Sequence, residues 1–147
     1  LQRLFIGASS HISARYHIAH GQRQENQSSS GIIVSTGAGS TGWMSSVFNE
    51  ASGIISYLGG QPIKPQPMSW EEERLLFVVR EPFVSLHSQA AIVVGTIKQS
   101  EPLKLESQMP CGGVIFSDGM ESDYLEFNSG TDATIGLARE KANLVVS

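Results

Sequence analysis

The feature that most constrains the fold is a single stretch of helical periodicity set among short, strand-like runs. From Thr41 onward, apolar side chains recur at spacings of three, four and seven residues, as they do on one face of an α-helix. They are Met44, Val47, Phe48, Ala51, Ile54, Ile55 and Leu58. Ser40 or Thr41 is the expected N-cap, and Gly59-Gly60 is the expected end. One principal helix therefore leaves most of the chain to strands and loops.

Most of the remaining chain has the pattern of short strands separated by turn signals. β-branched and aromatic residues gather in short runs, with glycine pairs, Asp118-Gly119 and Asn128-Ser129-Gly130 between them. The expected strands are 4–6, 14–19, 22–27, 31–36, 75–80, 91–97, 103–106, 114–116, 124–127, 133–137 and 144–146. Such a series is typical of an antiparallel β-sandwich or meander. The predicted fold class is mainly β, with one principal α-helix.

Two smaller features are expected between the helix and the later strands. Residues 61–68 contain Pro62, Pro65 and Pro67, and proline removes backbone donors, so this segment is predicted to be a connection or a lid. Ser69-Trp70-Glu71-Glu72 has the Ser-x-x-Glu form of a capping box and predicts the start of a single helical turn. Asp118-Gly119 predicts a hairpin turn between the strands at 114–116 and 124–127.

Length and charge exclude several classes of protein. A chain of 147 residues predicts one domain, and 40% hydrophobic residues exclude intrinsic disorder. Charged residues are only 16%, against roughly 25% in an ordinary domain. With 10 basic and 14 acidic side chains the formal charge is −4, which argues against a nucleic-acid partner. The longest apolar runs, such as 75–79, are far too short to cross a membrane.

The cysteine content and the first residue of the sequence also bear on its origin. Cys111 is the single cysteine, so the chain can form neither an internal disulfide nor a multi-cysteine metal site, and we expect a reducing, cytoplasmic location. The sequence starts at Leu1 without an initiator methionine or a signal-peptide pattern. We therefore expect it to be a piece of a longer protein.

The segment from Ser30 to Trp43 carries the clearest chemical signal. It contains Gly37-x-Gly39-x-x-Gly42 between an expected strand and the expected helix. Small residues let a ligand approach the backbone, and a helix N-terminus offers N–H donors to anions. A Rossmann unit would also need a second strand ending in an acidic residue about 20 positions on, and the segment 61–68 stands there instead. The plain alternative is a strand-to-helix turn that serves only packing.

This segment resembles the carboxy-terminal domain of NAD kinases. Gly31-Ile32-Ile33-Val34-Ser35-Thr36 followed by Gly39-Ser40-Thr41-Gly42-Trp43 is similar to the family's Asp-Gly-Leu-Ile-Val-Ser-Thr-Pro-Thr-Gly-Ser-Thr-Ala-Tyr. Ser29-Ser30-Gly31 and Arg80-Glu81-Pro82 look closer to the divergent branch that includes animal mitochondrial NAD kinases. The order of the later strands and turns also fits, so the resemblance covers essentially the whole chain. It implies the C-terminal domain of the NAD kinase/diacylglycerol kinase-like fold.

The resemblance implies a division of labour in the parent enzyme. In that family an amino-terminal α/β domain supplies a Gly-Gly-Asp-Gly loop with the usual candidate base, and this chain has no such loop. Residues 1–147 would then be the substrate-binding β domain, which holds NAD while ATP and Mg²⁺ act against the missing domain. The implied reaction is phosphoryl transfer from ATP to the 2′-hydroxyl of the NAD adenosine ribose, giving NADP. In the family the β domain also builds dimers and tetramers, and a eukaryotic member of the divergent branch would lie in the mitochondrial matrix.

The resemblance also assigns candidate substrate-binding residues. Thr41 matches a family threonine that lines the NAD site, and Gly42 occupies the small position where alanine is usual. Trp43 replaces a tyrosine and keeps a flat face for stacking on a ring, while Ser46 lies one helical turn further on. Ser30 stands where most members have aspartate, so a carboxylate bond would become a hydroxyl bond. The family's Asn-Glu pair should fall near Ile6-Gly7 and is absent there.

No catalytic residue and no metal site is predicted within the chain itself. His17 and His20 would lie on opposite faces of a strand, and Asp118 fits a turn better than a calcium loop. Arg80 and Glu81 are read either as a strand-ending ion pair or as a phosphate or carboxylate clamp. Two other functions stay open: a related lipid or sugar kinase half-domain, and a non-catalytic ligand-binding β-sandwich module.

Overall fold

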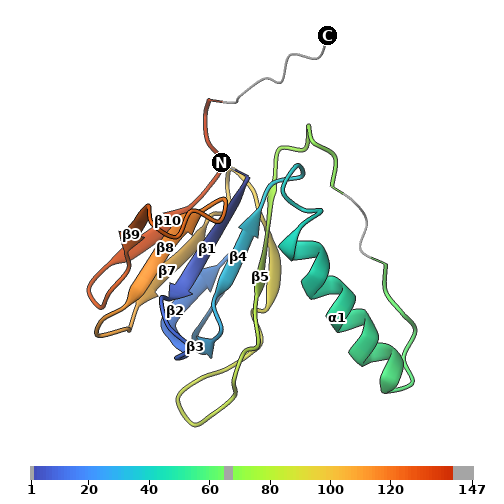
Figure 1. The fold of residues 1–147 in the computed structure, drawn as a ribbon, viewed down its shortest axis with the longest axis horizontal. Coiled ribbons are helices and arrows are strands. Elements are labelled where there is room, and N and C mark those ends of the chain that lie inside the picture. Colours follow the sequence, from blue (N-terminus) through green and yellow to red (C-terminus); the bar gives the residue numbers. More distant parts are fainter. Residues whose placement is uncertain (1, 65–67, 141–147) are drawn as a thin grey trace.

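Two antiparallel sheets and one helix make up the computed structural model, which describes residues 2–64 and 68–140 (Figure 1). The larger sheet has six strands in the order β6-β5-β4-β1-β8-β9, and the smaller has four in the order β10-β7-β2-β3. The elements are β1 (Arg3–Ala8), β2 (Ala14–His20), β3 (Arg23–Ser29), β4 (Ile32–Ser35), α1 (Trp43–Tyr57), β5 (Leu75–Val79), β6 (Val94–Ile97), β7 (Leu103–Ser107), β8 (Gly113–Ser117), β9 (Tyr124–Glu126) and β10 (Asp132–Ile135). All neighbouring strands pair antiparallel.

The main core lies between the two sheets. Alternation along each strand sends every second side chain inward, so Ile6 and Val34 of the larger sheet meet Tyr16 and Leu105 of the smaller one. Phe77 is also fully buried in this core. The side chains of β1, β4 and β5 at the intervening positions consequently point to the outer face of the six-stranded sheet.

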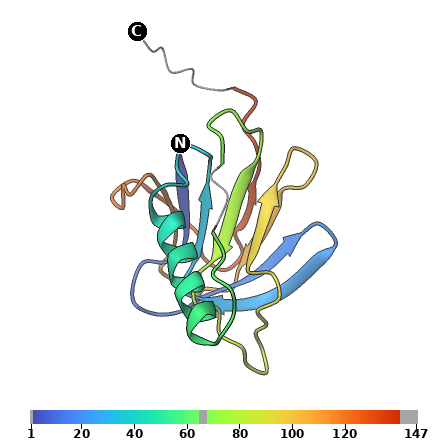
Figure 2. The same cartoon turned by 90° about the vertical axis from the view of Figure 1, so that its right-hand side faces the viewer.

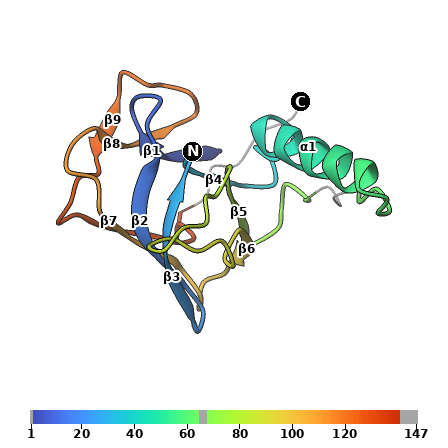
Figure 3. The same ribbon diagram turned by 90° about the horizontal axis from the view of Figure 1, so that it is seen from below.

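Helix α1 covers only part of that outer face (Figure 2). Met44 is buried against Ile33 and Val78, with Val47 and Phe48 half-buried around them. The helix then projects beyond the sheet, so that the far half of its apolar stripe is exposed, including Ile54 at 53% and Leu58 at 75% (Figure 3). The first turns of α1 therefore dock the helix.

The sequence-based prediction of the fold class is confirmed. Each strand of the described residues overlaps an expected one, and the one helix lies where the periodicity places it. The expected strand at 144–146 lies outside the described residues. Within residues 2–64 and 68–140, no helix has the length and apolar character that crossing a membrane requires.

Two local predictions were wrong. The N-cap of α1 is Gly42, without a side-chain cap, because the Ser40 hydroxyl donates instead to the Gly37 carbonyl at 2.7 Å and Thr41 is exposed. Ser69 and Glu72 form the expected backbone-to-carboxylate bond, with the Ser69 N–H donating to Glu72 Oε1 at 2.8 Å, but they close a turn and no helix follows.

Candidate functional site

A row of apolar side chains crosses the outer face of the six-stranded sheet. The strand register places Val78 beside Ile33, Ile33 beside Phe5, Phe5 beside Phe116, and Phe116 beside Tyr124. Directly opposite residues on one face of an antiparallel sheet contact one another. Five strands thus contribute one continuous apolar row, although its members are widely separated in sequence.

The helix covers one end of this row, and a cavity of about 810 Å³ lies over the other. Phe5, Phe116 and Tyr124 are among its lining residues, with Val114 and Glu126 from the next row along β8 and β9. Its walls come from the β1–β2 loop at 9–13, from the start of α1, and from the end of β5. The cavity therefore has an aromatic side and a polar rim.

Trp43, the first residue of α1, stands at the border between the covered and the open halves of the row. Its ring stacks on Phe5, with the ring centroids 5.6 Å apart and the planes 10° from parallel. The Arg80 guanidinium lies 4.6 Å from the centroid of the same ring. Phe5 in turn contacts Phe116 at 5.0 Å between centroids. Trp43 consequently extends the aromatic side of the cavity, and two protein groups already contact its ring.

The backbone holds Ser30 and Arg80 next to each other at the rim. The Ser30 N–H donates to the Arg80 carbonyl at 2.9 Å, and the Arg80 N–H donates to the Gly31 carbonyl at 2.8 Å. Gly31 has φ of +109°, and a Cβ on it would lie 2.7 Å from the Phe5 ring. Glycine is therefore required there on both counts, for the backbone conformation and for the aromatic ring that packs on it.

Ser30, Arg80 and Glu81 form a small polar cluster at that rim. The Ser30 hydroxyl donates to Glu81 Oε2 at 2.9 Å, and Arg80 Nη2 lies 3.6 Å from Glu81 Oε1. Glu121 and Glu126 also line the cavity. Three carboxylates against one guanidinium make the lining net negative, which favours neutral or cationic groups of a ligand over phosphate.

The loop that carries Glu81 is anchored to β3. The Ala91 and Ile92 N–H groups donate to the buried Glu25 carboxylate at 3.0 and 2.9 Å. Gln27 donates to the Ile92 carbonyl at 2.9 Å and to Glu25, and it accepts a bond from the buried Tyr16 hydroxyl at 2.9 Å. Burial raises the pKa of Tyr16 well above its usual range, so the phenol stays neutral.

The glycine-rich turn packs against its own chain. A Cβ on Gly37 would lie 2.8 Å from the Ser69 carbonyl carbon and closer still to its oxygen. A Cβ on Gly39 would lie 2.9 Å from Ser35 Oγ and closer still to the Gln2 carbonyl oxygen. The Gly39 N–H also donates to the Thr36 carbonyl at 3.1 Å. These contacts support the packing alternative for Gly37 and Gly39.

The predicted binding residues separate into two groups. Ser30 and Trp43 line the cavity together, whereas Thr41, Gly42 and Ser46 are exposed and are not among its lining residues. Sequence reasoning missed Phe5, Phe116 and Tyr124 as site residues. Their signal was the alternation of β1, β8 and β9, which only a known register could turn into one surface.

The part of the chain that the structure describes contains no group of three His, Cys, Asp or Glu side chains placed to hold a metal ion. His17 contacts the Asn26 side chain at 3.0 Å, and His20 contacts the Thr96 carbonyl at 2.9 Å. Asp118 accepts bonds from the Gln2 and Arg3 N–H groups at 3.0 and 2.9 Å. These side chains therefore serve the fold, and they do not provide the oxygen ligand set that Mg²⁺ requires.

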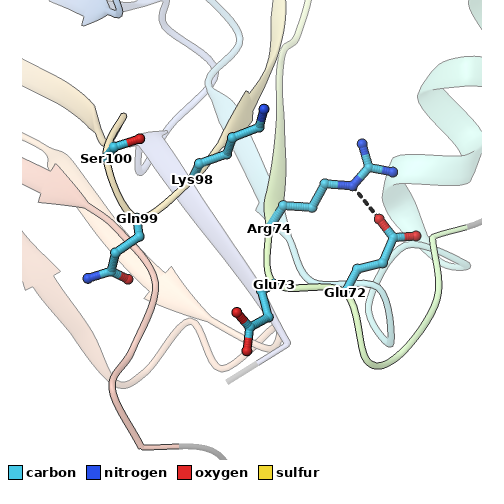
Figure 4. A pocket seen from close by; sticks show the side chains of 6 residues that line it. All are labelled: Glu72, Glu73, Arg74, Lys98, Gln99 and Ser100. Carbon is cyan, nitrogen blue, oxygen red and sulfur yellow. Dashed lines mark hydrogen bonds and ion pairs between the residues drawn. The ribbon is translucent and has the colours of Figure 1, made fainter.

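A second hollow, of about 470 Å³, lies between the segment 72–74 and the β6–β7 turn (Figure 4). Arg74 turns toward Glu72 and pairs with it, while Lys98, Gln99 and Ser100 line the other side. The Arg74 contact, followed by the Ser69 N–H, lowers the pKa of the Glu72 carboxyl. This hollow is lined by polar side chains and has no aromatic surface, so it is the weaker candidate.

Comparison with solved structures shows the fold of an NAD kinase. An NAD kinase from Archaeoglobus fulgidus, solved in complex with ATP, superposes with a TM-score of 0.56 at 14% sequence identity. The match covers 95% of this chain and 45% of that one, so this chain spans less than half the length of the archaeal enzyme. No family model matches the sequence, and no curated protein matches it. The similarity therefore supports an NAD kinase-like fold, consistent with a C-terminal β domain, while membership of the divergent branch stays a prediction.

Proposed function

We propose that this chain is the acceptor-binding β domain of an ATP-dependent NAD kinase-like phosphotransferase. The observation that carries the proposal is the cavity over Phe5, Phe116 and Tyr124. Ser30 and Trp43, the two ends of the segment that resembles NAD kinases, both line it. Aromatic surface suits the flat rings of a dinucleotide, and hydroxyl and carboxylate groups suit its ribose and amine donors. The NAD kinase-like fold supports the same class of ligand.

The reaction is proposed to be transfer of a phosphoryl group from ATP to the 2′-hydroxyl of the NAD adenosine ribose. Such transfer depends mainly on positioning and on neutralising charge in the transition state. The described residues do not fit Mg²⁺, so we assign no metal step to them. This chain would bind and orient the acceptor, and the base and the donor phosphates would be placed by the remainder of a longer enzyme. The isolated 147-residue chain is then expected to be inactive.

The polar rim argues for a nucleotide over a lipid. Arg80 and Glu81 line the cavity together with Ser30, and an acyl chain would displace water from these polar groups without offering them a hydrogen bond. A dinucleotide offers hydroxyl and amine groups to them and an aromatic ring to Trp43. The net negative charge of the lining also predicts that the phosphates of the ligand lie outside the cavity.

Calorimetric titration of the chain with NAD, NADP and ATP tests the proposal, together with two tyrosine variants. Tyr124 is half exposed at the end of the aromatic row, and Tyr57 is 89% exposed at the far end of α1. Tyr124→Ala should weaken NAD binding about threefold to tenfold, since an aromatic contact contributes roughly 0.5–1.5 kcal/mol. Tyr57→Ala is the matched control and should leave the affinity unchanged.

Two results would contradict the proposal. Absence of NAD and NADP binding by the folded chain would favour a different ligand class or a non-catalytic module. NADP formation by the isolated chain, incubated with ATP, Mg²⁺ and NAD, at a normal enzymatic rate would overturn the assignment of the base and the donor site to another part of the protein.

A further inference from the structure

The geometry points to Glu81 as a specificity-determining residue of the cavity, whose carboxylate accepts a hydrogen bond from a neutral N–H or O–H donor of a bound nucleoside. The inference rests on the proposed function, because it names a contact within the same cavity. Glu81 lines that cavity beside Arg80, which directly follows β5.

The backbone of Glu81 is the first observation. Its φ is +47°, in the left-handed region that favours glycine, and Pro82 follows it, although a residue before proline is normally extended. Among the described residues, Asp118 is the other non-glycine residue with positive φ, at +52°. Asp118 is of a type that adopts this conformation readily, and its carboxylate caps two N–H groups of the chain.

Within residues 2–64 and 68–140, the Glu81 carboxylate accepts no backbone N–H bonds comparable to those that stabilise the strained backbone at Asp118. The Glu81 side chain is 63% exposed, and its carboxylate accepts the Ser30 hydroxyl and lies 3.6 Å from Arg80 Nη2. An exposed ion pair at that separation contributes little to stability. Strained conformations of this kind are retained where function needs a group in a fixed place. The carboxylate of Glu81 lies at the rim of the cavity.

The carboxylate keeps acceptor capacity for a ligand. Two carboxylate oxygens offer about four acceptor sites, and Ser30 occupies one of them at 2.9 Å. The Ser30 bond and Arg80 fix the direction of the group, so little side-chain freedom is lost when a ligand binds. A preorganised acceptor of this kind favours a ligand that carries a donor at that point.

The surrounding charges decide which kind of ligand group can lie there. Glu121 and Glu126 line the same cavity, and the guanidinium of Arg80 is already shared between Trp43 and Glu81. A phosphate would meet net negative charge, whereas a neutral donor meets an acceptor. In a nucleoside the neutral donors are the exocyclic amine of the base and the ribose hydroxyls.

The test combines ligand binding with stability in three variants of the chain. Glu81→Gln keeps the size of the side chain and removes its charge, and Glu81→Gly removes the carboxylate and relaxes the backbone. Glu106→Gln is the matched control, because Glu106 is an exposed carboxylate on β7 of the other sheet. The probe is adenosine. Purine riboside, which lacks the amine, and 2′,3′-dideoxyadenosine, which lacks the 2′- and 3′-hydroxyls, are the comparison ligands.

Glu81→Gly should unfold at the same urea concentration as the wild type or a higher one, yet bind adenosine about tenfold or more weakly. Glu81→Gln should also bind adenosine more weakly, and Glu106→Gln should bind it normally. If the contact is to the amine, Glu81→Gln should not change the affinity for purine riboside. If the contact is to the 2′- or 3′-hydroxyl, the same substitution should not change the affinity for dideoxyadenosine.

Three outcomes would overturn the inference, and they are distinguishable from one another. Normal adenosine binding by Glu81→Gly would remove Glu81 from the site while leaving the proposed function intact. A lower urea midpoint for Glu81→Gly would show that the residue serves the fold. Absence of adenosine and NAD binding by the wild-type chain would defeat the proposed function itself, and the contact with it.

Discussion

Replacing Gly37 by alanine separates the packing role of the glycine-rich turn from a ligand-binding role. A Cβ at this position would lie 2.8 Å from the Ser69 carbonyl carbon and closer still to its oxygen, where ordinary contact begins near 3.4 Å. The obstructing atoms belong to the backbone and cannot turn aside as a side chain would. Overpacking of this kind typically costs about 1–3 kcal/mol. Gly37→Ala should lower the free energy of unfolding by about that amount.

Gly53→Ala is the matched control. Gly53 lies inside α1, and a Cβ on it would meet no atom within 4 Å. Alanine is favoured over glycine in a helix interior by about 1 kcal/mol, so this variant should be more stable than the wild type. The two substitutions should therefore change the free energy of unfolding in opposite directions, and the two variants should differ from each other by about 2–4 kcal/mol.

Urea denaturation at 25 °C measures both variants, and NAD titration of the folded protein accompanies it. We expect the Gly37→Ala protein that remains folded to bind NAD with an affinity close to that of the wild type. A Gly37→Ala variant of wild-type stability that no longer bound NAD would refute the packing explanation. That result would indicate that the glycine-rich turn contacts the ligand directly.

Three further predictions follow from single side chains. Trp43→Ala should weaken NAD binding by about 1–2 kcal/mol in calorimetry while unfolding stays two-state, and unchanged affinity would remove Trp43 from the site. Glu25→Ala leaves the buried Ile92 N–H and the Ala91 N–H without their acceptor, so urea denaturation should show a loss of about 2–5 kcal/mol, and a loss below 1 kcal/mol would contradict it. Because burial raises the pKa of Tyr16 in the folded state, the free energy of unfolding should fall as the pH rises above about 10, the pKa of tyrosine in the unfolded chain. The fall should be smaller in Tyr16→Phe, and identical alkaline stability profiles of the two proteins would refute this.

The local pattern of the sequence predicts the elements well because each depends on neighbouring residues. The strands expected at 14–19 and 22–27 form the β2–β3 hairpin, with Tyr16 opposite Gln27. The periodicity also finds the helix. It does not tell what covers the helix, and Ile54 and Leu58 belong to the apolar stripe yet are exposed. A pattern of apolar residues reports a face suited to burial and carries no information on its partner.

The candidate site depends on contacts that no local pattern contains. Phe5 and Phe116 are adjacent only because of the β1–β8 register, and Ser30 meets Glu81 only because the end of β5 pairs beside β4. A shift of one residue in either register would send these side chains to the opposite face. Sequence alone could therefore identify Ser30 and Trp43 as candidates, whereas the aromatic row could be recognised only from the strand pairing in the structure.

The same row explains why the helix and the cavity lie side by side. Ile33 and Val78 are buried by Met44 of α1, whereas Phe116 and Tyr124, on β8 and β9, line the open cavity. Tyr124 is left 50% exposed, and apolar surface in water carries a cost of roughly 25 cal/mol per Å². A flat aromatic ligand seated next to Trp43 would continue the cover that the helix begins. The strand-to-helix turn leads into this arrangement, since it ends at Gly42, the N-cap of α1, directly before Trp43.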